Sequence, residues 1–307
     1  MTFPDVRSLA PLQVNSTVLA IEGLQVPPEI AMEHFRHSGG EFPSVTVLPG
    51  AAPRAQFRTP AKGAIDLFGL KGLPITTLDV YFAKFVDGIR SPDAVHTKYP
   101  LAASAKAFGW IRRISCQDRG IAWAECEIVY LSATGMAHPV GAAANSSLPS
   151  LPAQPALHTL APTQVNAATH GGALGFTFDL NPDIMLGLEG NPGDGLLYHT
   201  LATYMGGAPT IEVDHGDPIA LLGTLGQTGV VLGAQGFKQW LREFDAVNHV
   251  ALPTGISFSI AQNAGRVVPV AYGADTGRVA KGGLRIEGLS AGATHPVVVG
   301  SGTVPTL

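Results

Sequence analysis

Short segments from the first half of this 307-residue chain recur in the same order in the second half. The separation between matching positions stays between 151 and 158 residues, and a drift of this size is what loop insertions produce. We therefore predict a tandem duplication, with residues from about 9 to 140 and from about 160 to 297 as two copies of one β-rich domain. The matching segments are 9–15 with 160–166, 28–30 with 182–184, 50–53 with 206–209, 59–60 with 217–218, 69–72 with 223–226, His96 with His249, and 138–140 with 295–297.

The stretch between the two copies has a composition of its own. Residues 141–159 are rich in Ala, Ser, Pro and Leu and contain no Asp, Glu, Lys or Arg. Proline at this density disfavours helix and sheet and favours an extended connection. We therefore predict a first domain over residues 1–140, a linker over 141–159 and a second domain over 160–307. A long loop inside a single domain is the alternative.

Each copy is expected to contain several antiparallel strands. Residues 54–58 alternate polar and apolar side chains, as a strand with one solvated face does, and a hairpin is expected around Asp118-Arg119-Gly120. In the second copy, residues 255–262 and 267–272 are expected to form the corresponding pair of strands. The other strands predicted in the first copy are 29–36, 44–48, 77–85 and 94–101, and the hairpin strands are 107–116 and 121–131.

One short helix is predicted in each copy. In the first copy Thr59 is the expected N-cap, Pro60 the first helical residue and Gly69 the stop. In the second copy Asp217, Pro218 and residues 219–223 repeat this pattern. The predicted fold class is therefore mainly β, with two tandem, similar β-sandwich or barrel domains that each carry one short flanking α-helix. One helix per copy is too few for a Rossmann arrangement.

The composition points to extensive contacts with other subunits. Charged residues make up only 14% of the chain, whereas about 25% is typical of soluble proteins. A surface with so few charges is expected to be partly buried against other subunits. An alanine-rich composition that reflects only the genome is the alternative.

The two cysteines and the hydropathy pattern narrow the class of protein. Cys116 and Cys126 have no second Cys pair or neighbouring His, so a zinc ribbon is excluded and they are expected to be buried, unpaired residues of one hairpin. No apolar run approaches the roughly 18 residues of a membrane helix. Residues 1–5 lack the pattern of a signal peptide. We therefore expect a protein made in the cytoplasm with no membrane segment.

The charge distribution argues against a protein that grips nucleic acid. Residues 1–150 carry 13 Lys and Arg against 12 Asp and Glu, and residues 151–307 carry 6 against 11. A nucleic-acid-binding chain is expected to be basic on one face. A mildly acidic surface is instead compatible with DNA that passes without adhering.

Candidate sites of chemistry are weak, and no catalytic, cofactor-binding or metal-binding residue is predicted. The Gly-rich run 190–195 lacks the Lys-Ser/Thr of a phosphate-binding loop. The run Asp214-His215-Gly216-Asp217 could hold a metal, but His215 has no paired ligand at helical or hairpin spacing. His34 and His37 lie three apart on a segment expected to be strand and turn, and positions three apart on a strand lie on opposite faces. Arg112-Arg113 is interpreted as solvated or interfacial charge.

A family resemblance is carried by the run 50–60, the run 80–85, His96 and the hairpin 107–131. Their residue pattern resembles the tail-tube family of long-tailed bacteriophages, the siphophages. The resemblance covers the first copy better than the second. It implies a β-sandwich with a flanking helix that assembles into rings, whose inner strands join into a barrel around a DNA channel. Tail rings usually have six-fold symmetry, so a chain with two such domains would need only three copies for a pseudo-hexameric ring.

The resemblance implies a virion structural protein, not an enzyme, located in the tail and assembled in the host cytoplasm. Its partners would be further copies of itself, as homotrimeric rings that stack, other tail proteins, and DNA that passes through the lumen without sequence-specific binding. A tail-tip hub or distal adaptor with one ring per virion is the first alternative. A β-rich hydrolase or carbohydrate-binding protein is the second, and it would need clustered carboxylates or exposed aromatic side chains.

Overall fold

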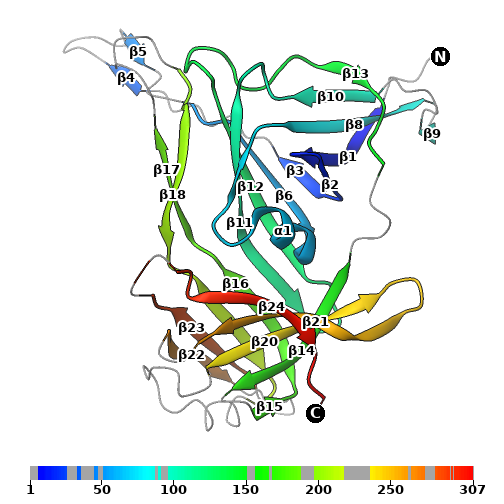
Figure 1. Ribbon diagram of the computed structural model, residues 1–307, viewed down its shortest axis with the longest axis vertical. Coiled ribbons are helices and arrows are strands. Elements are labelled where there is room, and N and C mark those ends of the chain that lie inside the picture. Colours follow the sequence, from blue (N-terminus) through cyan, green and yellow to red (C-terminus); the bar gives the residue numbers. More distant parts are fainter. Residues whose placement is uncertain are drawn as a thin grey trace.

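β-strands dominate the residues that the computed structural model describes (Figure 1). For residues 6–10, 33–35, 45–47, 86, 89–90, 269–273 and 281 only the backbone is described. No helix among the described residues is long and apolar enough to cross a membrane. The described residues are 6–25, 33–35, 45–47, 51–86, 89–90, 96–150, 156–165, 168–187, 197–217, 236–261, 264–273, 281–290, 292 and 294–306.

Three larger antiparallel sheets and two hairpins make up the fold. One sheet contains β1 (Val6–Val14), β2 (Thr17–Leu19), β8 (Leu78–Val86), β9 (Ile89–Arg90), β10 (His96–Pro100) and β13 (Ala144–Ser146). The nine-stranded sheet contains β3 (Glu22–Gln25), β6 (Arg54–Pro60), β7 (Leu73–Ile75), β11 (Lys106–Gln117), β12 (Trp123–Leu131), β16 (Ala173–Asp179), β19 (Thr210–His215), β22 (Gly265–Gly273) and β23 (Lys281–Gly288). The third sheet contains β14 (Leu157–Val165), β15 (Ala168–His170), β20 (Phe237–Asp245), β21 (Val250–Ile260) and β24 (Val297–Thr303). The hairpins are β4 (Glu33–Phe35) with β5 (Val45–Val47) and β17 (Pro182–Gly187) with β18 (Leu201–Gly207). The mainly β prediction is therefore confirmed.

The strands before residue 147 and those after residue 156 are ordered in the same way. The first sheet runs β13-β10-β8-β1-β2, and the third runs β24-β21-β20-β14-β15. The nine-stranded sheet contains two further matching runs, β11-β12-β6-β3 and β22-β23-β19-β16, which are joined where β16 pairs with β11. Taken in chain order, each strand of one run has a counterpart in the other.

Local irregularities recur at matching places. Strand β1 is bulged at Ala10-Pro11 and β14 at Ala161-Pro162, because proline has no N–H to give to the ladder. The bulge of β11 after Ile111 has a counterpart in β22 after Pro269. In both His-Pro-Val runs the histidine Nδ1 accepts the N–H of the valine two residues later, at 3.1 Å.

One sequence match does not survive in the strand register. Leu12 faces Leu19 and Val80, and Thr163 faces His170 and Gln239, so Val80 and Gln239 occupy matching positions. Two residues along, Phe82 pairs with Thr97 and Leu241 with Ile256, which makes Gly255 the counterpart of His96. His249 instead lies in the turn before β21 with φ of 54°. The match of His96 with His249 was therefore wrong.

The helix α1 (Ala61–Phe68) begins one residue later than predicted. Thr59 does not cap it, because Thr59 is the penultimate residue of β6 and its hydroxyl donates to the Ala20 carbonyl at 2.8 Å. Pro60 is the N-cap, with extended ψ of 134°. Gly69 ends the helix at positive φ, as predicted. The second predicted helix after Asp217 lies outside the described residues.

The hairpin at 107–131 is confirmed, but its predicted counterpart is wrong. Strands β11 and β12 pair around a turn in which Arg119 has positive φ. Residues 255–262 and 267–272, however, fall on β21 and β22, which belong to different sheets. The Ala264 N–H donates to the Ala261 carbonyl at 3.1 Å between these two strands of different sheets. The partner of β22 is β23, which follows it along the chain.

The predicted linker 141–159 is not an extended connection throughout. Strand β13 lies inside the predicted linker 141–159 and pairs with the edge of β10, and β14 begins at Leu157. The expectation that proline would keep this stretch out of the sheets was therefore wrong. The prolines of the run fall outside β13, at 149, 152 and 155, so they do not interrupt its ladder.

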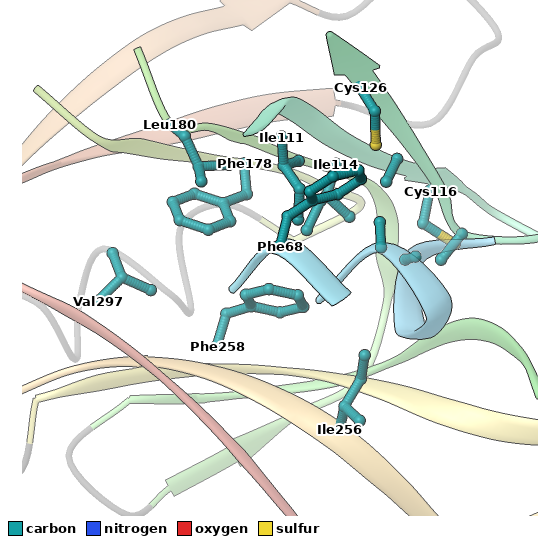
Figure 2. Packing of buried hydrophobic residues seen from close by; sticks show 14 of the residues in the cluster. Phe68, Ile111, Ile114, Cys116, Cys126, Phe178, Leu180, Ile256, Phe258 and Val297 are labelled. Carbon is teal, nitrogen blue, oxygen red and sulfur yellow. The ribbon is translucent and has the colours of Figure 1, made fainter. Parts of the chain in front are cut away.

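One main hydrophobic core runs through the described part of the chain, beside two smaller clusters. It contains fully buried side chains from all three larger sheets and from α1. Figure 2 shows Phe68 of α1, Ile114 of β11 and Phe178 of β16 on one side of the core and Phe258 of β21 on the other. The rings of Phe178 and Phe258 are 5.4 Å apart. The core therefore packs residues from before 147 directly against residues from after 156.

Candidate assembly interface

The nine-stranded sheet has one apolar face and one polar face. Along β6, Ala55 and Phe57 point into the core, so Arg54, Gln56 and Arg58 must point away from it. A row of polar side chains follows from the cross-strand pairs, because directly paired residues share a face. From β3 to β22 the row is Glu22, Arg58, Glu125, Arg113, Asp179, Thr210, Glu287 and Arg266.

Most arginines on this polar face are engaged by a carboxylate. Glu127, which is only 3% exposed, accepts a hydrogen bond from Arg54 at 2.6 Å, and its other oxygen lies 3.5 Å from Arg112. Arg113 donates to Asp179 across the pair of β11 and β16. Charges of opposite sign thus alternate over the sheet, and these guanidinium groups are compensated within the chain.

Other cations of the face are also held locally. Arg58 lies over the ring of Trp123, 5.4 Å from its centre. Arg285 lies between Glu212 and Glu287, with N···O distances of 3.8 and 3.9 Å. A phosphate backbone that met this face would have to compete with these partners for the guanidinium groups.

A cleft of about 650 Å³ lies on this face beside the beginning of β17. Its walls include Arg54, Arg112, Glu127, Asp179 and Asp183. Two of its carboxylates, Glu127 and Asp179, already accept bonds from guanidinium groups. The cleft therefore contains an ion-pair network around Glu127 and Asp179.

The hairpin β17–β18, which we call the second arm, covers one end of the polar face. It contributes Ile184 and Tyr204 to a separate hydrophobic cluster with Trp110 and Leu131. Trp110 is 6% exposed and packs against Phe108 with ring centres 6.1 Å apart. Figure 1 shows the second arm running beside β11 and β12. This packing, together with the pairing of β11 and β16, fixes the two runs of strands to each other.

The two ends of the nine-stranded sheet have unpaired outer edges among the described residues. Strand β3 pairs with β6 alone, and β22 pairs with β23 alone. In the matching order of strands, β3 is the counterpart of β16, and β22 is the counterpart of β11. The two strands at the open ends are thus the counterparts of the two that pair inside the chain. Open edges of this kind are templates for pairing with another chain.

His215 and Asp214 do not form a common site. His215 is buried below β19, and its Nδ1 accepts the Asp217 N–H at 2.9 Å, whereas Asp214 lies on the opposite face of the strand. Burial lowers the pKa of His215 below its usual value. Among the described residues, no group of three His, Cys, Asp or Glu side chains is arranged to hold a metal.

The remaining sequence candidates divide between described and undescribed parts of the chain. Arg112 and Arg113 lie on β11 within the charged face, and their side chains are about half exposed. His34 lies on β4, while His37 and the Gly-rich run 190–195 lie outside the described residues. Glu125 and Glu127 also belong to the charged face and were not predicted, although they alternate with the apolar residues of 124–130.

Both cysteines are free and buried, as predicted. Cys126 lies opposite Ile111, so the two thiols are not paired across the hairpin. Burial raises the pKa of Cys116 to about 12 and also raises that of Cys126. Neither thiol is therefore in the thiolate form near neutral pH, and neither is suited to nucleophilic chemistry.

No protein-family model matches this sequence, and no curated protein is significantly similar to it. Functional inference therefore rests on the geometry described above and on the resemblance noted in the sequence.

Proposed function

We propose that this protein is a virion structural protein, the subunit of a siphophage-like tail tube. In this proposal the chain is a tandem duplication with two sandwich-like domains, and three chains form a pseudo-hexameric ring. The observation that carries it is the joint between β11 and β16 together with the free edges of their counterparts, β22 and β3. The pairing that joins β11 to β16 inside one chain can then be repeated between two chains, by β22 of one and β3 of the other.

The proposed contact between chains is heterologous, because it joins two different strands, so each chain can bind a further chain at its other open edge. Strand β22 of one chain would pair antiparallel with β3 of the next, in the manner of β11 with β16. Head-to-tail contacts of this kind close into a ring when the rotation between subunits allows it. Each chain carries eight strands along the continuous path of the sheet. Three chains then give a closed barrel roughly 50 Å across, for strands about 4.8 Å apart and tilted by about 40°.

The polar face suits the lining of a channel for DNA. The opposite face is already occupied by the core, so the polar face is the one left to line the lumen. Four of its guanidinium groups, those of Arg54, Arg112, Arg113 and Arg285, are held by carboxylates. A lining with compensated cations lets a polyanion pass without adhering. The mechanism would be structural, without catalysis and without a cofactor.

The registers of the joint define a cross-linking test. Gln25 and Thr177 match, because they face Gln56 and Glu212 at the same position of β6 and β19. Gly273 and Ser115 also match. Ladder pairing resumes after the bulge at Arg113 in β11 and at Ala271 in β22, and each of the two residues lies two positions further along. Ser115 pairs with Thr177 inside the chain. Gly273 of one copy should therefore lie opposite Gln25 of the next.

We expect the double variant Gln25→Cys and Gly273→Cys to form covalent trimers under oxidation. Each single variant is the matched control and should give no trimer on a non-reducing gel. Negative-stain images of the unmodified protein should contain six-lobed rings. Monomers at high concentration, or cross-linked dimers without trimers, would contradict the proposal.

A tail-tip hub or distal adaptor is the second candidate, because the same free edges serve a single ring equally well. Polymerisation separates the two positions in the tail. A tube subunit should form long stacked tubes, alone or when induced, whereas a hub should stop at single rings.

A further inference from the structure

The second arm covers a surface whose counterpart on the other run of strands is bare. Trp110 and Leu131, under the second arm, are 6% and 5% exposed. Their counterparts are Val268 on β22 and Leu289 just after β23, which are 36% and 42% exposed. The same place in the fold is thus closed in one run and open in the other.

The correspondence follows from strand register and not from residue similarity. Trp110 pairs with Glu127, and Val268 pairs with Arg285. The bulge of β11 follows Ile111, the residue after Trp110, and the bulge of β22 follows Pro269, the residue after Val268. Leu131 pairs with Lys106 at the start of β11. The Leu289 N–H likewise donates to the Ala264 carbonyl, next to the start of β22, at 2.7 Å.

The first arm, which we define as residues 28–47 including β4 and β5, is the counterpart of the second arm. The first arm follows β3 and precedes β6, just as the second arm follows β16, the counterpart of β3, and precedes β19. Figure 1 shows β4 and β5 at one end of the long axis and β22 and β23 at the other. Strands β4 and β5 of a chain therefore do not lie on the Val268–Leu289 surface of the same chain.

We propose that the first arm of one copy packs on the Val268–Leu289 surface of the next copy. The second arm reaches from β16 onto the face of β11 and β12, which adjoin it. A first arm that leaves β3 would reach β22 and β23 of the chain paired with β3 in the same way. This inference rests on the proposed ring and adds to it a contact outside the strand seam.

The sequence of the first arm fits this surface. The run Pro28-Glu29-Ile30 matches Pro182-Asp183-Ile184 of the second arm. On the same alignment Met32 stands at the position of Leu186, so apolar residues stand where Ile184 and Leu186 contact the Trp110 cluster. The surface also carries Arg266, where β11 has Phe108, and the first arm contains acidic residues that could oppose that charge.

A photo-cross-linking experiment tests the contact directly. A benzophenone amino acid replaces Leu289, and equal amounts of ¹⁵N-labelled and unlabelled protein are mixed before irradiation. We expect cross-linked peptides between residue 289 and the segment 28–47 that join one labelled and one unlabelled chain. The same replacement at Val247, which is exposed in the turn before β21, is the matched control and should not capture the segment.

A second variant measures the contribution of the contact. Leu289→Asp should raise the concentration needed for half-maximal trimer by about tenfold or more, whereas Val247→Asp should leave it unchanged. Trimers that form without cross-links to 28–47, or that Leu289→Asp does not weaken, would overturn the arm contact and leave the ring. Absence of trimers in the unmodified protein would overturn both.

Discussion

The continuous core predicts that both halves of the chain unfold together. Phe178 is fully buried at the joint between β16 and β11, where it pairs with Ile114 and lies 5.4 Å from the ring of Phe258. Replacing a buried Phe by Ala removes the ring and leaves a cavity, at a cost of about 3–5 kcal/mol. The change Phe178→Ala should therefore lower the free energy of unfolding of the whole chain by that amount.

Urea titration followed by tryptophan fluorescence measures this loss. With a slope of about 3 kcal/mol per molar urea, the midpoint should fall by roughly 1 to 1.7 M. Single-tryptophan variants that keep Trp123 or Trp240 report on β12 and β20 separately, and both midpoints should fall together. The conservative Phe178→Leu should produce a smaller loss at both reporters. Two separate transitions, or a shift seen by Trp240 alone, would refute the idea of one cooperative core.

Three further predictions follow from buried polar groups. Gln239→Leu should destabilise the chain by about 2–3 kcal/mol in a urea titration, because it leaves the Thr163 hydroxyl and two backbone carbonyls without their partner. Because burial lowers the pKa of His215, the unfolded chain takes up protons more readily below its usual pKa of about 6.5; stability should fall as the pH drops from 7 to 5, and His215→Gln should weaken this dependence. Cys116 and Cys126 should not react with a thiol reagent at pH 8 until urea unfolds the chain, and rapid reaction of the folded protein would contradict their burial.

The sequence predicted the strands better than their partners. The alternation in 54–58 correctly predicted a strand with one polar face, and the Asp118-Arg119-Gly120 turn correctly predicted the hairpin of β11 and β12. Both signals are local, so they remain readable without the rest of the fold. Residues 255–262 and 267–272 were expected to pair in the same way, yet they fall on β21 and β22, which belong to different sheets. Only the arrangement of the other strands decides between a hairpin and a corner.

The charged face was readable only in part. Alternating residues on β6, β11 and β12 indicate which side chains leave the core, but they do not say which strands are neighbours. The pairing of Arg113 with Asp179 joins residues 66 positions apart, and no periodicity in the sequence encodes it. The edges β3 and β22 became candidates for assembly only when the strand order gave each of them a counterpart inside the chain.

The two counterparts of the joint differ in a way that fits the proposed assembly. Inside the chain the second arm lies on Phe108, Trp110 and Leu131, a largely apolar surface that folding keeps covered. At the proposed joint between chains, Arg266 and Val268 take the places of Phe108 and Trp110. A surface that must remain in water until a partner arrives cannot expose a tryptophan–phenylalanine pair without inviting aggregation. In the proposed ring, charge at that position would keep the free subunit soluble and would give the contact a preferred partner. A duplicated chain would then allow the joint inside the chain to be apolar, because it is never open, and would require the joint between chains to be polar, because each subunit would be made before its ring.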